Sequence, residues 1–333
     1  MTLKTPHFWY RKPAGSPHLL EYLLTPFSKV YQLLYTLDQS IHKPYKAKIP
    51  VICIGNIVAG GTGKTPTAIA LLKLVKSKNL AKKPVFLIRG YGGAETGPLI
   101  VNPGIHTSWD VGDEALILAK HAPTIVGADR AESAKIAMQE NADLIIMDDG
   151  LQNPGIHKDL RLVVINGEMG LGNLKMMPAG PLRQPLEDGT ANANGFIFIG
   201  NDENNVINML PAGKPVTHAT LKPAANLNID PQIPYLAFAG LGYPEKFFNF
   251  LSRTLKFNIV ETIAFSDHHP YDENDIKTLH TKAEKHGAKL ITTEKDFMRL
   301  PKLEGIEVEI LPVEMTWDNE EDLLPLIKTV IHP

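Results

Sequence analysis

The chain has 333 residues, of which 44% are hydrophobic and 21% are charged, and its formal net charge is −2. These values are typical of an ordinary globular protein and do not favour a nucleic-acid binder, which would need a basic surface. The single cysteine, Cys53, excludes an internal disulfide and fits a reducing, cytosolic environment. We find no signal-peptide pattern and no run of about 18 apolar residues, so we expect no membrane-spanning segment.

Residues 1–48 differ from the rest of the chain in charge and in periodicity. They carry seven Lys and Arg against two acids, a net charge of +5. From Ser16-Pro17, a favourable helix start, apolar residues recur at steps of three and four, and Pro26 is a potential kink. Such an amphipathic helix beside cations suits either a membrane interface or packing on the protein's own core, and the sequence leaves both open. The stripe consists of Leu20, Leu23, Leu24, Phe27, Val30, Tyr31, Leu34, Leu37 and Ile41.

The next stretch has the pattern of a phosphate-binding loop. A short apolar strand, Val51–Ile54, leads into a glycine-rich turn, and residues 66–77 have the pattern of a helix. In this context backbone N–H groups and the helix N-terminus would hold phosphate, Lys64 would reach the β- and γ-phosphates, and Thr65 would offer its hydroxyl to Mg²⁺. The residues expected to contact the nucleotide are Val58, Ala59, Gly60, Gly61, Thr62, Gly63, Lys64 and Thr65.

Two positions of this loop depart from the usual patterns. Val58 stands where the common loop has its first glycine, and Ala59 stands where the variant with a glycine pair often has an extra lysine. A plain turn between a strand and a helix, without any ligand, is the structural alternative. We favour phosphate binding because Gly63-Lys64-Thr65 occurs in the strand–turn–helix context that the motif requires.

From residue 49 to about residue 216 strands alternate with helices, which predicts an α/β fold. The rhythm favours a mostly parallel sheet of the P-loop type, flanked by helices, with ligands at the carboxyl ends of the strands. The segment Thr217–Pro234 is rich in Pro, Asn and Ala, and we expect a linker there. A second βα series over 235–333 predicts a smaller C-terminal α/β lobe. The expected strands are Val51–Ile54, Pro84–Ile88, Thr124–Val126, Asp143–Met147, Leu162–Ile165, Phe196–Ile199, Tyr235–Ala239, Ile259–Ala264, Leu290–Thr293 and Glu307–Leu311.

Carboxylates follow or precede several of these elements. Asp148 and Asp149 close an apolar strand and are suited to hold Mg²⁺ directly or through water, and Gln152 is close enough to reach the same place. Asp113 and Glu114 open a helix, where an acidic residue is either a helix cap or a carboxylate that faces the nucleotide. The sequence leaves both roles of Asp113 open.

Basic and histidine residues occupy other loops at strand ends. Arg130 opens a helix and Arg183 lies in a Pro- and Gly-rich loop, so each is a candidate phosphate contact or an ordinary ion-paired surface residue. His268 follows a strand of the second lobe, where it suits a carboxylate partner, a substrate contact or a cap. In Thr293–Asp296 a glutamate interrupts the order of a guanine-reading loop, which argues against a GTPase.

Taken together, these motifs resemble the tetraacyldisaccharide 4′-kinases, the lipid A 4′-kinases of Gram-negative envelope synthesis. They cover nearly the whole chain in family order. The resemblance implies ATP- and Mg²⁺-dependent phosphorylation of the 4′-hydroxyl of an acylated glucosamine disaccharide 1-phosphate. It also implies a two-lobed peripheral protein on the cytoplasmic face of the inner membrane, with its N-terminal helix at the lipid surface. The motifs that carry it are Gly55-Asn56, Gly60–Pro66, Arg89–Gly92, Val111–Glu114, Asp148–Gln152, Gly180–Arg183, Asp267–His269 and Thr293–Asp296.

The resemblance also assigns roles to residues. It implies that Asp113 is the catalytic base with His268 as its partner. From the loop motif we expect Lys64 to be catalytic as well. The resemblance places Thr65, Asp148, Asp149, Glu114 and Gln152 around Mg²⁺ and the nucleotide, and Arg130 and Arg183 at substrate or phosphate. Two alternatives remain on residue patterns alone. They are a P-loop ATPase acting as a switch or metallochaperone, and a soluble kinase of small molecules.

Overall fold

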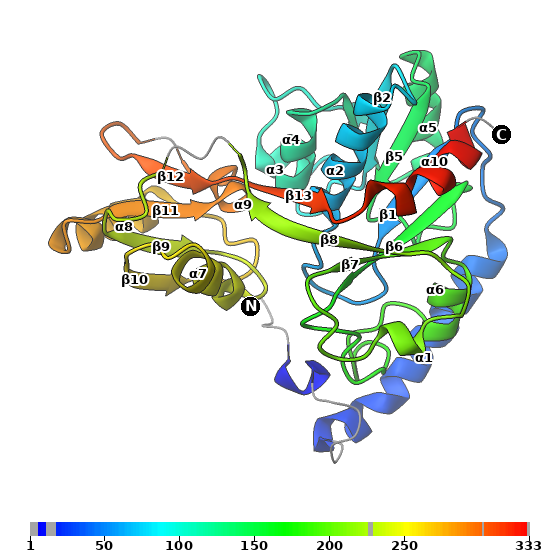
Figure 1. The fold of residues 1–333 in the computed structure, drawn as a ribbon, viewed down its shortest axis with the longest axis horizontal. Helices are drawn as coiled ribbons and strands as arrows, with labels where there is room; N and C mark the ends of the chain where they lie inside the picture. The colour runs from blue at the N-terminus through cyan, green and yellow to red at the C-terminus, as the bar shows by residue number, and fades with distance from the viewer. Residues whose placement is uncertain (1–5, 11–17, 226–228, 302, 332–333) are drawn as a thin grey trace.

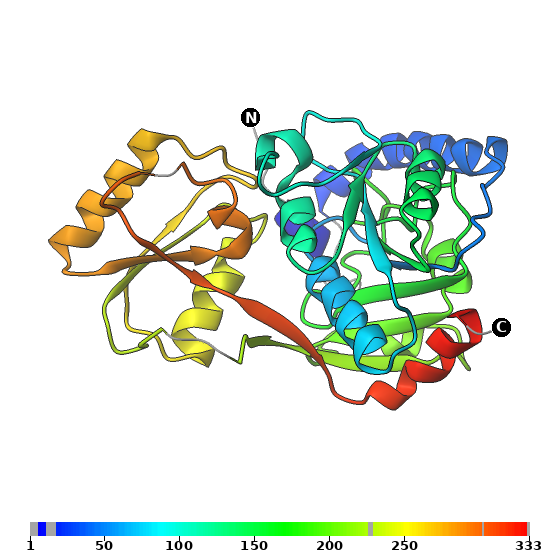
Figure 2. The same ribbon diagram turned by 90° about the horizontal axis from the view of Figure 1, so that it is seen from above.

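The computed structural model describes residues 6–10, 18–225, 229–301 and 303–331. Within these residues the strands form two sheets, each the centre of one lobe, and β8 and β13 run between the lobes (Figure 1). Figure 2 shows the same two lobes from above, with the smaller one to the left. The α/β architecture of both lobes agrees with the class predicted from the βα rhythm.

The described residues place nine strands in the larger sheet, in the order β13-β8-β7-β6-β1-β5-β2-β4-β3. Strand β1 lies in the interior of this sheet, with β5 and β6 as parallel neighbours. Among the described strands the antiparallel pairings of this sheet are at its two edges, β13 with β8 and β3 with β4. The carboxyl ends of the central strands therefore meet at one edge, where ligands of such sheets bind. The strands are β1 (Val51–Gly55), β2 (Pro84–Ile88), β3 (Leu99–Ile100), β4 (Thr124–Val126), β5 (Leu144–Asp148), β6 (Leu160–Asn166), β7 (Gly195–Ile199), β8 (Val216–Pro223) and β13 (Val313–Trp317).

The smaller sheet is parallel throughout its described strands, in the order β10-β9-β11-β12. Helix α8 packs on β9 and β11, and α7 packs on β9 and β10. Buried apolar residues on both faces of β9 make this lobe a separate hydrophobic unit. Its strands are β9 (Tyr235–Ala239), β10 (Ile259–Ala264), β11 (Lys289–Thr293) and β12 (Val308–Leu311).

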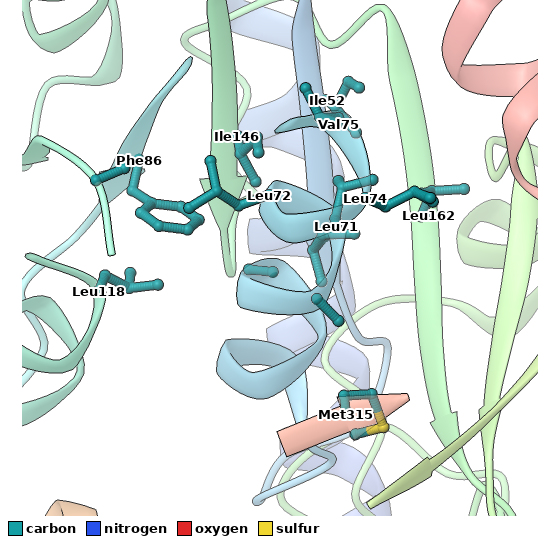
Figure 3. Packing of buried hydrophobic residues seen from close by; sticks show 14 of the residues in the cluster. Ile52, Leu71, Leu72, Leu74, Val75, Phe86, Leu118, Ile146, Leu162 and Met315 are labelled. Atoms are coloured by element: carbon teal, nitrogen blue, oxygen red, sulfur yellow. The ribbon is translucent and has the colours of Figure 1, made fainter. Parts of the chain in front are cut away.

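Both faces of the larger sheet are covered, which explains why its central strands are continuous apolar runs. Ile52 and Ile54 of β1 pack against α2, whereas the alternate residues Val51 and Cys53 face the opposite core beneath α5. Figure 3 shows the first of these cores, in which Leu71, Leu72, Leu74 and Val75 of α2 meet side chains from several strands. The helices are α1 (Leu19–Ile41), α2 (Lys64–Ser77), α3 (Ser108–Val111), α4 (Asp113–Ala119), α5 (Arg130–Gln139), α6 (Leu186–Ala191), α7 (Pro244–Asn249), α8 (Glu273–Lys285), α9 (Glu294–Phe297) and α10 (Leu324–Ile331), with short turns η1 (His7–Tyr10), η2 (Ile207–Met209), η3 (Phe250–Thr254) and η4 (Glu320–Asp322).

The expected linker at Thr217–Pro234 is wrong over residues 217–223, which belong to β8. Strand β8 pairs with β7 on one side and with β13 on the other, so it extends the larger sheet. The expected lobe at 235–333 is likewise too long, because β13 and α10 return to the larger lobe, where Met315 and Ile327 join its core. The antiparallel partners β8 and β13 are far apart in sequence, and a local composition pattern does not reveal such a pairing.

The expected N-terminal helix is present as α1, which lies along the outside of the larger lobe (Figure 1). The expected start at Ser16-Pro17 lies outside the described residues. The described helix is capped at His18, whose backbone N–H donates to Glu21 Oε1 at 3.2 Å. It continues through Pro26 to Ile41. Among the described helices, none combines the length and the apolar character needed to cross a bilayer.

Candidate active site

The glycine-rich turn lies between β1 and α2 and is held by its own side chains. Asn56 Nδ2 donates to Thr62 Oγ1 at 2.9 Å, and both side chains are buried. Gly63 caps α2 with a φ of 89°, a backbone conformation that is strained for a residue with a Cβ, so the position favours glycine. The turn thus presents the N-terminus of α2, whose free N–H groups are suited to bind phosphate.

Lys64 and Thr65 place their side chains at the carboxyl end of β5. Thr65 Oγ1 donates to Asp148 Oδ2 at 2.7 Å, and Lys64 Nζ lies 3.6 Å from Asp149 Oδ2. This proximity follows from the sheet, since β1 and β5 are parallel neighbours whose carboxyl ends meet at the same edge. The structure therefore brings together four residues that the sequence predicted at the nucleotide.

Asp148 is a buried carboxylate with one free oxygen. Its Oδ1 finds no hydrogen-bond partner in the described part of the chain, although the residue is only 1% exposed. Burial raises the pKa of Asp148 to about 7, against the opposing effects of the Thr65 hydroxyl and the Lys64 charge. A free carboxylate oxygen beside a threonine hydroxyl fits Mg²⁺, which prefers oxygen ligands. The described residues contain no group of three or more His, Cys, Asp or Glu that could hold a metal.

Asp149 is paired with two cations. Arg183 Nη1 donates to Asp149 Oδ1 at 2.6 Å, and Lys64 lies on the other carboxylate oxygen. Burial alone would raise the pKa of Asp149, but the charges of Lys64 and Arg183 lower it. Asp149 therefore holds Lys64 and Arg183 in place, and its role as a metal ligand stays a prediction.

Gln152 and Arg130 border the same region. Gln152 Nε2 donates to the Asn56 carbonyl at 2.9 Å and to Gln184 Oε1 at 2.7 Å. Its own Oε1 is buried and has no partner among the described residues, so it is available to a ligand. Arg130 is 3% exposed and donates to the Gly127 carbonyl, and within the described residues its Nε is unpaired. Burial lowers the pKa of Arg130 to about 10, at which value it is still a cation at neutral pH.

Asp113 and His268 face each other across the two lobes. Asp113 opens α4 and is 2% exposed, and its Oδ2 lies 3.5 Å from His268 Nδ1, which is an ion-pair contact rather than a hydrogen bond. Burial would raise the pKa of Asp113, but the contact with His268 and the charge of Lys295 more than offset this and lower it. The pKa of His268 is raised because the Asp113 carboxylate stabilises the protonated ring, despite desolvation of the ring. The sequence left the role of Asp113 open, and the structure gives it a histidine partner.

Ion pairs between α4 and α9 join the lobes next to this pair. Lys295 Nζ donates to Glu114 Oε1 at 2.5 Å, and Lys120 Nζ donates to Glu294 Oε1 at 3.1 Å. Burial alone would lower the pKa of Lys295, but the charges of Glu114 and Asp113 raise it. Glu114 thus has a lysine partner in this structure, and its predicted role at the metal stays a prediction.

A cleft of about 2450 Å³ extends between the lobes and joins these groups. Its wall includes the turn from Gly60 to Thr65, the carboxylate of Asp148 and, from the smaller lobe, His268. Arg130, Gln152 and Arg183 line it as well. The cleft therefore offers space for a triphosphate and a second substrate between the N-terminus of α2 and His268.

Comparison with known proteins decides the family. The LpxK family model, described as tetraacyldisaccharide-1-P 4′-kinase, matches residues 20–332. The chain belongs to this family. Among its relatives, the tetraacyldisaccharide 4′-kinase of Gluconobacter oxydans (strain 621H) is 40% identical over 98% of this chain and 99% of the relative. The enzyme of that name from Rhodospirillum centenum is 40% identical over 99% of this chain and 97% of the relative.

A solved LpxK structure shows the same fold. The "apo" form of LpxK from Aquifex aeolicus, in complex with ATP, superposes with a TM-score of 0.74 at 24% identity and covers 94% of this chain and all of its own. The LpxK family match confirms three expectations from the sequence: the family itself, a phosphotransferase with an alcohol acceptor, and the lipid A 4′-kinase function. The mostly parallel α/β fold is confirmed as well.

In this LpxK family member, helix α1 docks through polar side chains. Ser28 Oγ donates to a backbone carbonyl of the loop after β6 at 2.8 Å, and Tyr31 Oη donates to the Arg183 carbonyl at 3.2 Å. Glu21, 5% exposed, forms an ion pair with Lys175 at 3.1 Å. The side of the helix that faces the protein is therefore polar, the reverse of the usual pattern for a helix on a globular surface.

The apolar stripe of α1 faces away from the protein. Most of its predicted members are exposed, so the alternative of packing on the protein's own core does not hold for them. Leu24 and Tyr31, at the edge of the stripe, are partly buried. The exposed large apolar residues of α1 are Leu19, Leu20, Tyr22, Leu23, Phe27, Val30, Leu33, Leu34, Leu37 and Ile41.

Sequence reasoning missed three polar contributors to the site. Asn56 holds the glycine-rich turn and Arg183, whereas Lys295 and Arg299 approach Glu114 and Asp113 from the smaller lobe. Asn56 and Lys295 occur within motifs that carry the family resemblance, and their place in these motifs could have identified them as site residues. Arg299 lies outside those motifs, and the sequence indicates a site role for it only through its place one helical turn after Lys295.

Proposed function

We propose that this protein transfers the γ-phosphoryl group of ATP to the 4′-hydroxyl of an acylated glucosamine disaccharide 1-phosphate at a membrane surface. The observation that carries the proposal is that Lys64, Asp148 and His268 line one cleft in the described part of the chain, and that the buried Asp113 carboxylate lies in contact with His268. The related Aquifex aeolicus protein was solved in complex with ATP, which supports a nucleotide in the corresponding cleft.

The phosphate loop would hold the triphosphate. Backbone N–H groups of residues 58–65 and the N-terminus of α2 surround phosphate oxygens, and Lys64 reaches the β- and γ-phosphates. Lys64 is held near this position by Asp149, which is itself fixed by Arg183. Gln152 Oε1 and Arg130 are further nucleotide or phosphate contacts, because each has a buried polar atom that no described residue satisfies.

Thr65 and Asp148 are the residues best placed to hold Mg²⁺. The Thr65 hydroxyl and the free Oδ1 of Asp148 are oxygen donors at the carboxyl end of β5. When bound, Mg²⁺ neutralises charge on the phosphates of the transferring group. Asp149 and Glu114 are less suited to bind Mg²⁺, since each carboxylate is already paired with a cation.

The Asp113–His268 pair would act on the acceptor sugar. The 4′-oxygen attacks the γ-phosphorus in line, the bond from that phosphorus to the β,γ-bridging oxygen breaks, and the hydroxyl proton passes to Asp113. Because the transition state of phosphoryl transfer is loose, the proton leaves late and a carboxylate of low pKa can accept it. His268 orients the carboxylate and balances its charge while the sugar is bound.

The exposed apolar side of α1 would lie in the membrane interface. An exposed stripe of this length on a water-facing surface is unfavourable, whereas an amphipathic helix gains free energy when its apolar side enters the acyl boundary. This placement suits a peripheral protein on the cytoplasmic face of the inner membrane, where the glycolipid and ATP are both available. Nucleic acid is not expected as a partner, because the net charge is −2.

The deciding experiment is incubation of the protein with ATP, Mg²⁺ and the disaccharide lipid in mixed micelles, followed by a mass measurement. We expect a product heavier by one phosphate. Asp113→Asn should lower kcat by about 10²-fold or more with little change in the KM for ATP, because it removes the proton acceptor and leaves the phosphate loop intact. The control Asp322→Asn, an exposed carboxylate on η4, should keep full activity.

The same assay separates the alternatives. ATP hydrolysis that a protein partner stimulates, with no phosphorylated lipid, would indicate a nucleotide switch. Phosphorylation of a water-soluble sugar at a rate that does not depend on micelles would indicate a small-molecule kinase. An unchanged turnover in Asp113→Asn would remove Asp113 from the role of base.

A further inference from the structure

Arg299 is a buried cation in the contact between the lobes. It follows α9 in the smaller lobe, and its side chain is 8% exposed. The guanidinium is oriented by Asp296, whose Oδ1 accepts from Arg299 Nη2 at 3.0 Å and also from Gly240 N and from the hydroxyl of Tyr271, each at 2.8 Å. Asp296 is fully buried, so the direction of the guanidinium is fixed by a carboxylate that cannot turn away.

Arg299 braces the turn that carries His268. His268 has a φ of 52°, a left-handed conformation that is unfavourable for a residue with a side chain. Its N–H donates to the Gly240 carbonyl at 3.1 Å, and the same carbonyl accepts from Arg299 Nη2 at 3.2 Å. Arg299 Nη1 donates to the His269 carbonyl at 3.2 Å. Two of the carbonyls that define this turn are thus held by one guanidinium.

The same guanidinium faces the other member of the pair. Arg299 Nε lies 3.4 Å from Asp113 Oδ2, the oxygen that His268 Nδ1 approaches at 3.5 Å. Asp113 belongs to the larger lobe and His268 to the smaller one. In the described residues that oxygen is buried and has no hydrogen-bond partner, so its surroundings depend on how the two lobes meet.

We propose that Arg299 is a positioning residue, which sets the distance and orientation between Asp113 and His268 by binding the histidine turn and the carboxylate at once. The proposal rests on the function proposed above, since it assigns a role within that reaction. Its physical basis is geometric, because a planar guanidinium donates in fixed directions. Here its hydrogen bonds reach the carbonyls of Gly240, His269 and Lys295 and the carboxylate of Asp296. Its positive charge also lies within ion-pair distance of Asp113 Oδ2. Arg299 need not touch either substrate.

A role through Asp113 can be distinguished from a merely structural one. The test is a double-mutant cycle of kcat with Arg299→Met, Asp113→Asn and the variant that carries both. If Arg299 acts through Asp113, Arg299→Met alone should lower kcat by about 10²-fold, and in the Asp113→Asn background it should cause little further loss. The KM for ATP should change by less than about twofold, because the phosphate loop does not contact Arg299.

Two further variants complete the test. Arg299→Lys keeps a cation but not the planar set of donors, so it should recover only part of the lost kcat. Lys277→Met, which removes an exposed cation from α8 of the same lobe, is the matched control and should behave as wild type. If Arg299→Met does not fold, as judged by thermal unfolding, Arg299→Lys takes its place in the cycle.

The outcomes are distinct. Losses of kcat that multiply in the double variant, or a kcat of Arg299→Met equal to wild type, would overturn the positioning role while the kinase function stands. Absence of phosphorylated lipid with the wild-type protein would instead overturn the proposed function. Non-additive losses with a constant KM for ATP would support the positioning role of Arg299.

Discussion

We predict that the outward apolar side of α1 contributes to membrane affinity, by an amount that follows from the exposed fractions of its side chains. Leu23 and Leu34 lie three turns apart on that side and are 59% and 60% exposed. Full burial of a leucine side chain is worth about 2 kcal/mol, so insertion of the exposed part of each should contribute about 1.2 kcal/mol. The double variant Leu23→Asn/Leu34→Asn should therefore lose about 2.4 kcal/mol of membrane affinity, roughly a 50-fold weaker partition coefficient.

The assay is sedimentation with vesicles that contain anionic lipid, with the bound fraction measured over a range of lipid concentrations. The matched control is Met209→Asn/Val260→Asn, which removes two exposed apolar residues that lie outside α1. Circular dichroism and thermal unfolding should show that both double variants are folded. Equal partition coefficients for wild type and the Leu23/Leu34 variant would refute the membrane role of this side of α1.

Three further predictions concern the cleft. Asp148→Asn should lower kcat by about 10²-fold and weaken the dependence of activity on Mg²⁺, measured by a Mg²⁺ titration, because it removes the free carboxylate oxygen. Gly63→Ala should raise the KM for ATP by about tenfold, since a φ of 89° is strained for alanine and the turn would have to shift. The pKa of His268 is raised by Asp113, so the ion pair should stabilise the fold fully below about pH 6.5, the ordinary histidine value, and less as pH rises through the raised pKa. The Tm difference between wild type and His268→Asn should accordingly be larger at pH 6 than at pH 9.

Each of these has a contradicting result. An unchanged Mg²⁺ titration would remove Asp148 from the metal site, and an unchanged KM in Gly63→Ala would mean that the turn does not hold phosphate. A Tm difference that is constant or grows from pH 6 to pH 9 would show that the protonated His268 does not stabilise the contact. The control for Asp148→Asn is Asp318→Asn, which changes an exposed carboxylate at the end of β13.

Local patterns were sufficient to predict the strand, the glycine-rich turn and the helix that we propose hold the nucleotide. The strand Val51–Ile54, the glycine turn and the helix after it require only neighbouring residues, and the parallel sheet then brings Asp148 to the same edge. Asp113 and His268 were candidates because each stands next to a predicted strand or helix. Their contact across the lobes, and the pairing of Glu114 with Lys295, depend on how the lobes dock.

The sequence by itself determined the glycine-rich turn between a strand and a helix, the α/β rhythm and the amphipathic character of the first helix, because these are properties of residues close together along the chain. Only the tertiary structure decided that β8 pairs with β13, that α1 turns its polar side inward, and that Arg299 reaches Asp113. The physical reason is that periodicity specifies which residues share a side of an element, whereas the surface against which that side lies is set by segments distant in sequence.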